Sequence, residues 1–148
     1  MIAVLQRVRD ARVDINSETT GAIDHGLVVL LGVLAGDTES DAEYLAEKTA
    51  HLRIFNDDQD KMNLSVQDVG GSVLVVSQFT LCADTSKGRR PSYIQAASPP
   101  KATELYEFFL ERIRQWNIPA QSGEFGAMMD VHLVNEGPVT IILDSQNR

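Results

Sequence analysis

The sequence predicts one α+β domain over residues 1–148, in which a barrel-like, mostly antiparallel β-sheet carries two outer helices. Three observations support this fold class. The length suits one domain with a single core. Most apolar segments are short and β-branched, as in strands, and only two have helical spacing. Short connections join most of the strand segments, which favours antiparallel pairing and a layered arrangement of helices on a sheet.

The first strand is predicted over residues 2–15, where apolar side chains nearly alternate with polar ones. The alternation fails near Asp10, so we expect an irregularity there. A second, short strand falls within GAID (residues 21–24), between two turns. The run LVVLLGVL (residues 27–34) is continuously apolar and predicts a strand buried on both faces.

The first helix is expected to begin at Thr38 or Ser40, since both are good N-cap residues and acidic residues follow. It is expected to end near Ile54. The second helix is expected from Pro99 or Pro100 to residues 116–117, because proline is accepted in a first helical turn. The inner faces are predicted to be Tyr44, Leu45, Lys48, Leu52 and Phe55 in the first helix, and Leu105, Phe108, Phe109, Arg112 and Ile113 in the second.

The remaining segments predict further strands and one long loop. Residues 62–65 form a short strand, and the start of SVLVVSQFTLCAD (residues 72–84) forms a buried one. The segment from 85 to 100 is rich in Ser, Gly and Pro and reads as an exposed loop. Two strand-like runs with glycine punctuation end the chain. Gly137-Pro138 interrupts the last one and is expected to be a turn with a trans bond, because only about 5–6% of X-Pro bonds are cis.

Charge and composition limit the class of protein. The net charge of −8 argues against a broad basic face that coats nucleic acid, although a small part of an RNA is still a possible ligand. Positive charge gathers at residues 7–12 and 87–90. Lys87, Arg89 and Arg90 either contact phosphates or are solvated surface residues. The longest apolar run is too short to cross a bilayer. The single Cys82 and the absence of a signal-peptide pattern favour the cytoplasm.

No metal or cofactor is expected. His25, His51 and His132 are far apart, and no zinc-binding or phosphate-loop motif occurs. Nucleophilic catalysis is one option at SQFT, where Ser77 or Thr80 follows the apolar strand and needs a neighbouring base. These side chains otherwise simply end the strand. A third option is that backbone N–H groups at this junction stabilise an oxyanion.

Five motifs occur in one order: MIAVLQRV at the start, SQFTL from Ser77, RRPSY from Arg89, FGAMM from Phe125 and NEGPVT from Asn135. Together they resemble the D-aminoacyl-tRNA deacylase family over essentially the whole chain. Tyr93 and Glu136 differ mildly from the family pattern, and neither difference removes a group that the chemistry needs.

The resemblance implies a homodimer with active sites at the subunit interface, acting on the 3′ end of aminoacyl-tRNA without a metal or organic cofactor. Such enzymes hydrolyse the ester of D-amino acids on tRNA and also remove glycine from alanine tRNA. The alternatives are a non-catalytic RNA-binding module and a Ser/Thr hydrolase of small esters.

The resemblance also implies roles for individual residues. Ser77, Gln78, Phe79 and Thr80 form the pocket wall, the Phe79 and Thr80 N–H groups bind the oxyanion, and water attacks directly with help from the ribose 2′-hydroxyl. Gly137-Pro138 becomes a cis unit that excludes L side chains in the partner's site. Arg7 braces this unit, and Phe125 and Met129 line the adenosine or amino-acid pocket.

Overall fold

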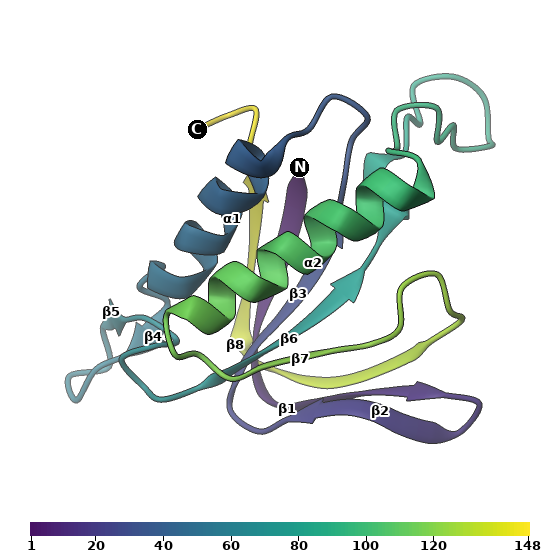
Figure 1. Ribbon diagram of the computed structural model, residues 1–148. Helices are drawn as coiled ribbons and strands as arrows, with labels where there is room; N and C mark the ends of the chain where they lie inside the picture. The colour runs from purple at the N-terminus through teal and green to yellow at the C-terminus, as the bar shows by residue number, and fades with distance from the viewer.

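The computed structural model describes residues 1–148: a mixed six-stranded sheet is nearly closed into a barrel, a small two-stranded sheet lies apart from it, and two helices lie side by side across one face of the larger sheet (Figure 1). The strands are β1 (Ile2–Ile15), β2 (Glu18–Ile23), β3 (Gly26–Gly32), β4 (Phe55–Asn56), β5 (Met62–Leu64), β6 (Ser72–Ser77), β7 (Ala120–Ser122) and β8 (Asp130–Asp144). The helices are α1 (Glu39–His51), the 3-10 helix η1 (Phe79–Cys82) and α2 (Pro99–Gln115). The predicted fold class is confirmed.

The long strand β1 organises the sheet. Its first half pairs with β3 and its second half with β2, while β8 runs antiparallel along its other edge. The centre of the sheet differs from the prediction, because β3, β6 and β7 are parallel to one another. The helices α1 and α2 are the crossovers that parallel neighbours require. The sequence prediction of mostly antiparallel pairs was based on the lengths of the connections. Length alone does not show whether a helix in a connection joins two parallel strands or only packs on the sheet.

Two bulges interrupt the pairing of β1 with β8. Val8 faces Asn135 and Ala11 faces Leu133, so two residues of β1 oppose one of β8, which places the predicted irregularity at Arg9-Asp10. The second bulge is larger, because Gln6 faces Thr140 and the four residues between Asn135 and Thr140 oppose Arg7 alone.

The Gly137-Pro138 segment occupies this larger bulge. The trans turn expected from the local pattern alone is wrong, because β8 continues through the segment, whereas the cis bond implied by the resemblance is confirmed. Gly137 has φ +120°, a conformation that L side chains rarely adopt. Four residues of β8 lie opposite one residue of β1 and do not fit a regular ladder. The four residues therefore form a bulge, and pairing with β1 resumes on both sides of it.

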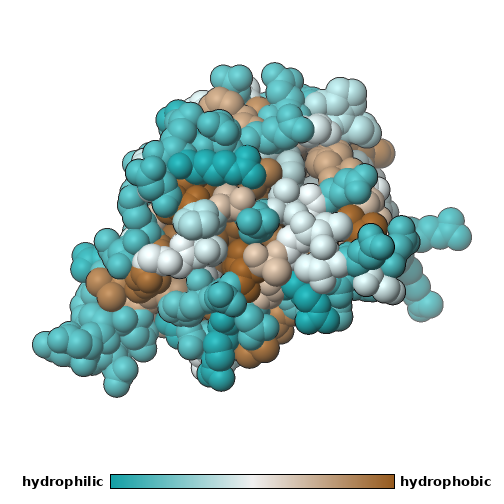
Figure 2. Space-filling model, turned by 60° about the horizontal axis from the view of Figure 1, so that its bottom comes forward, coloured by the Kyte–Doolittle hydropathy of each residue, from teal (hydrophilic) through white to brown (hydrophobic).

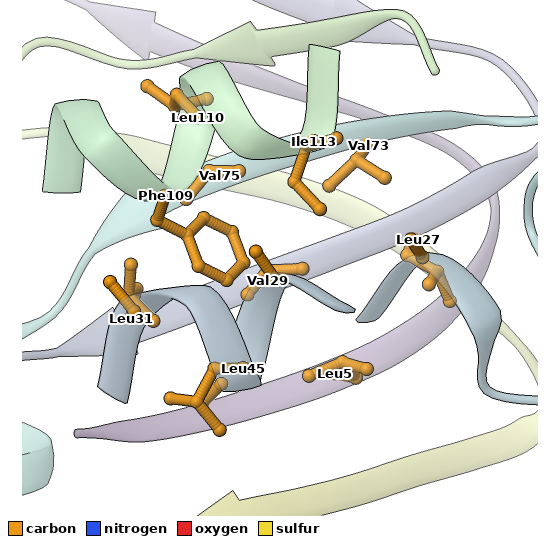
Figure 3. Close-up of a cluster of buried hydrophobic side chains, with 14 of the residues drawn as sticks. Leu5, Leu27, Val29, Leu31, Leu45, Val73, Val75, Phe109, Leu110 and Ile113 are labelled. Atoms are coloured by element: carbon orange, nitrogen blue, oxygen red, sulfur yellow. The ribbon is translucent and has the colours of Figure 1, made fainter. Parts of the chain in front are cut away.

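The main core lies between the helices and the sheet, where Phe109 reaches towards β3 and β6 (Figure 3). A smaller cluster fills the other side of the sheet, so that Leu27 and Val28, adjacent on β3, belong to different cores. The prediction that this strand is buried on both faces is confirmed.

The predicted end of the first helix is wrong. Leu52 leaves the helical conformation (φ −64°, ψ 125°), so α1 ends at His51 and Phe55 belongs to β4. Lys48 is exposed, and the inner face of α1 uses alanines instead, which allows a close approach to α2. In α2 the bounds agree with the prediction, but the inner face includes Tyr106 and Leu110, whereas Phe108 is only half-buried.

The beginning of α1 yields a prediction about pH. Burial of Asp41 favours a raised pKa, but hydrogen bonds from the backbone and hydroxyl of Thr38 and from Ser145 and Arg148 outweigh it and lower the pKa from 3.8 to about 2. A depressed folded-state pKa means that the carboxylate stabilises the fold above about pH 4, and that this contribution is lost as the pH falls through about 2. Asp41→Asn should therefore cost about 1 kcal/mol of unfolding free energy at pH 7, as loss of a capping group does, with a smaller difference near pH 2.

Urea denaturation of the wild type and variant at pH 7, 4, 3 and 2 measures this effect. Asp58→Asn, which removes an exposed carboxylate without a hydrogen bond, is the matched control and should change little at any pH. A deficit of Asp41→Asn that stays constant down to pH 2 would contradict the assignment.

Candidate active site

An apolar pocket with a volume of about 470 Å³ opens beside the carboxyl end of β6. Parallel strands bring their carboxyl ends to one edge of a sheet, where loops are free to form a binding site. Here β6 ends at Ser77, and the N–H of Gln78 donates to the carbonyl of Leu31 on β3 (2.8 Å), which fixes the junction. The lining residues are Leu31, Val33, Val76, Ser77, Gln78, Phe79, Ala97, Ala102, Tyr106, Phe125, Gly126, Ala127, Met128, Met129 and Val131.

Three of the four SQFT residues line this pocket: Ser77, Gln78 and Phe79. Thr80 does not; it is exposed on η1, where its hydroxyl accepts a hydrogen bond from the Gln78 side chain. Within this chain, no histidine, carboxylate or lysine hydrogen-bonds to Ser77 or Thr80, so the chain by itself forms no catalytic dyad at this junction.

The pocket contains one ionisable side chain, Tyr106 of α2. Burial raises its pKa to about 12, even though a hydrogen bond with Ser122 and the charge of Arg114 favour a lower value. The phenol is thus neutral near pH 7, and it donates to the carbonyl of Val75 (2.8 Å). Its ring packs edge-on against Phe125, with 5.8 Å between centroids. Tyr106 shapes the pocket without exchanging protons.

The segment from Phe125 to Met129 also lines this pocket, so Phe125 and Met129 lie close to Ser77, Gln78 and Phe79. Met128 and Tyr106 were missed in the sequence. Tyr106 lies one position after Leu105 on the same helical face, so a wider apolar stripe on α2 was the available signal. Met128 belongs to the FGAMM motif, but no local pattern showed that it lines the pocket, because its position depends on the path of the loop.

Arg7 lies in a separate place, against the Gly137-Pro138 bulge. It is buried, donates to the carbonyls of Ile54 (2.7 Å) and Glu136 (3.3 Å), and reaches Asn56. A Cβ added to Gly137 would lie 3.0 Å from its Nη2 atom. Arg7 thus contacts the segment that contains Gly137-Pro138.

Two neighbours of the bulge add to these contacts. The Asn135 side chain donates to the carbonyls of Arg7 (2.9 Å) and Val139 (3.0 Å), which ties the two ends of the bulge together. The Glu136 carboxylate lies 3.3 Å from His25 and 3.6 Å from Arg7. None of these residues, nor Gly137 or Pro138, lines the apolar pocket of the same chain.

The structure contains no group of three or more His, Cys, Asp or Glu side chains able to hold a metal ion. Neither helix is long and apolar enough to span a bilayer.

Comparison with known proteins places this fold and pocket in a class. A family model described as D-Tyr-tRNA(Tyr) deacylase matches residues 4–144. The solved structure titled "c-Myc DNA Unwinding Element Binding Protein" superimposes with a TM-score of 0.91 at 40% identity, covering 97% of this chain and 98% of that one. The fold and sequence together define an ester hydrolase of the tRNA deacylase class.

Full-length relatives narrow the class further. The D-aminoacyl-tRNA deacylase of Thermosipho melanesiensis is 58% identical over 147 residues, covering 99% of this chain and 98% of the relative. That of Halalkalibacterium halodurans is 56% identical over 146 residues, with 99% and 100% covered. The chain belongs to the D-aminoacyl-tRNA deacylase family and is a hydrolase.

Proposed function

We propose that the protein hydrolyses the ester that joins a D-amino acid to the 3′-terminal ribose of tRNA, releasing the free D-amino acid and reusable tRNA. The observation that carries this proposal is an apolar pocket, beside a strand-to-helix junction, whose one ionisable lining residue is a neutral tyrosine. Such a pocket suits an amino-acid side chain and a nucleobase. Aminoacyl-tRNA is used in translation, so the cytoplasm is the expected location.

The chemistry is assigned to backbone groups and the substrate. The first N–H groups of a helix lack intrahelical acceptors, and no side chain caps η1, so the N–H groups of Phe79 and Thr80 are free to bind an oxyanion. Water attacks the ester carbonyl with help from the ribose 2′-hydroxyl, the tetrahedral intermediate collapses, and the 3′ oxygen leaves with a proton. One oxyanion donor contributes about 10²–10³-fold in related acyl-transfer sites.

A homodimer is proposed because β8 has a free edge. It pairs only with β1, and exposed apolar side chains occur along it or just before it. They include Ile142 (71% exposed) and Met128 (91% exposed). Hydrophobic areas also interrupt the hydrophilic surface in Figure 2. A long, apolar, unpaired edge favours pairing with another chain, and closed two-fold dimers are the commonest solution.

In a dimer, Gly137-Pro138 can act in the pocket of the partner chain, whereas it lies outside the pocket of its own chain. The segment lies outside the pocket of its own chain but on the strand with the free edge. We assign it to the partner's pocket, where its backbone leaves space for a D side chain or a hydrogen and collides with an L side chain. The same argument predicts hydrolysis of glycine mischarged on alanine tRNA, because glycine presents only hydrogen.

The direct test compares D- and L-tyrosyl-tRNA as substrates. We expect hydrolysis of the D ester and almost none of the L ester. Equal hydrolysis of both would refute exclusion by Gly137-Pro138 and favour an unselective small-ester hydrolase. If the folded protein hydrolysed neither ester, the proposed activity would be refuted and an RNA-binding module would be favoured.

Thr80→Ala distinguishes the backbone mechanism from a covalent one. With backbone donors and direct attack by water, kcat should stay within about threefold of wild type, because the N–H group is kept. Loss of a true nucleophile costs about 10⁴-fold or more. Multiple-turnover kinetics with D-tyrosyl-tRNA measure kcat. A loss of that size in a folded variant, with an acyl-enzyme trapped from the wild type, would establish Thr80 as the nucleophile.

A further inference from the structure

The loop between η1 and α2 carries an unpaired cluster of positive charge. Asp84 and Ser92 exchange backbone hydrogen bonds of 2.8 and 2.9 Å, which close the loop at its base. Every residue between them is exposed. Lys87, Arg89 and Arg90 make no ion pair, and their side chains donate no hydrogen bond within the chain.

This lack of partners distinguishes Arg89 and Arg90 from every other arginine of the chain. The other seven arginines each donate a hydrogen bond or make an ion pair: Arg7, Arg9, Arg12, Arg53, Arg112, Arg114 and Arg148. In a chain with net charge −8, carboxylates are plentiful, yet none pairs with this loop. The cluster therefore keeps its full charge available for an anionic ligand.

The loop is attached to the rim of the pocket through an aromatic contact. Tyr93 follows the loop, and its ring packs edge-on against Phe79 at 5.0 Å between centroids. Phe79 lines the pocket and remains 59% exposed. Ile94, beside Tyr93, is 90% exposed. The charges thus adjoin apolar surface at the rim, a combination that suits single-stranded RNA, whose bases stack on aromatic rings while cations hold the phosphates.

We infer that Lys87, Arg89 and Arg90 bind backbone phosphates of the tRNA strand that ends in the pocket. The inference rests on the proposed function and adds the part of the substrate that the pocket does not hold. The pocket contains no cation, so attraction for a polyanion has to come from outside it. Guanidinium groups bind phosphate oxygens with paired hydrogen bonds, and such contacts position a nucleic acid without reading its sequence.

The test uses the variant Lys87→Gln/Arg89→Gln/Arg90→Gln and two substrates, D-tyrosyl-tRNA and D-tyrosyl-adenosine, which has no phosphate. We expect KM for the tRNA to rise tenfold or more with little change in kcat, and both constants for the adenosine ester to stay the same. The affinity for uncharged tRNA should also fall tenfold or more. The slope of log K against log salt should become shallower by about 2, as expected for three lost single-strand phosphate contacts.

The matched control is Lys48→Gln/Arg53→Gln/Lys61→Gln, which removes the same charge from α1 and from the region of β4 and β5, at the opposite end of the molecule (Figure 1). It should retain the wild-type KM and salt slope. Unchanged tRNA binding in the loop variant, equal losses on both substrates, or an equal loss in the control would each overturn the inference. Binding of uncharged tRNA decides the question even if the wild type hydrolyses neither ester, a result that would count against the proposed function alone.

Discussion

Gly137→Ala is expected to reduce the preference for D- over L-tyrosyl-tRNA by about 30-fold, equivalent to ~2 kcal/mol. The φ of +120° at Gly137 is unfavourable for alanine. The new Cβ would also lie 2.9 Å from Val139 Cγ2 and 3.0 Å from Arg7 Nη2. The bulge has to shift to relieve these contacts, and the backbone that we propose excludes L substrates shifts with it.

The ratio of kcat/KM for the two esters measures this change. Gly36→Ala is the matched control, because its φ is not positive and nothing lies within 4 Å of the added Cβ. It should keep the wild-type preference. If Gly137→Ala also keeps it, with a wild-type melting temperature, the bulge does not set selectivity.

The second large effect is expected in hybrid dimers: a chain with a blocked pocket should restore the preference for D-tyrosyl-tRNA to a Gly137→Ala chain. Ala97→Trp should fill the pocket, since Ala97 lines it and is half-buried. In a hybrid dimer of Ala97→Trp with Gly137→Ala, the one open pocket belongs to the Gly137→Ala chain and faces an intact Gly137-Pro138 from its partner. Hydrolysis of L-tyrosyl-tRNA should therefore fall about tenfold at tenfold excess of the Ala97→Trp chain, while D hydrolysis remains.

The control for this experiment is an excess chain that carries both substitutions, which should give no rescue because it brings no intact bulge. L hydrolysis that stays constant as Ala97→Trp is added would mean that Gly137-Pro138 acts within its own chain. Hybrids are best obtained by coexpression with two different affinity tags, so that their formation is verified before the assay.

The local elements followed from sequence where one physical signal was sufficient. The apolar run of β3, the N-cap at Thr38 and the prolines at the start of α2 each correspond to an observed feature. The irregularity near Asp10 was visible because a bulge breaks period-two alternation. The end of α1 was misjudged because Leu52 and Phe55 continue the helical spacing after the backbone has turned away.

The candidate site was only partly visible. The SQFT motif, Phe125 and Met129 came from the resemblance, and the structure brings Ser77, Gln78, Phe79, Phe125 and Met129 around one pocket. Spacing alone left Thr80 open as a nucleophile. Only the folded structure shows which side chains lie beside the Thr80 hydroxyl, because the residues that surround a side chain come from distant parts of the chain.

By itself the sequence determined the α+β class, the strand segments, the two helices and the family, since these depend on local patterning and on motifs in order. Only the tertiary structure decided the parallel pairing of β3, β6 and β7, the neutral Tyr106 in the pocket, and the passage of β8 through the Gly137-Pro138 bulge as one continuous strand. Register, burial and backbone conformation at one residue depend on partners far away in sequence, and no local pattern records them.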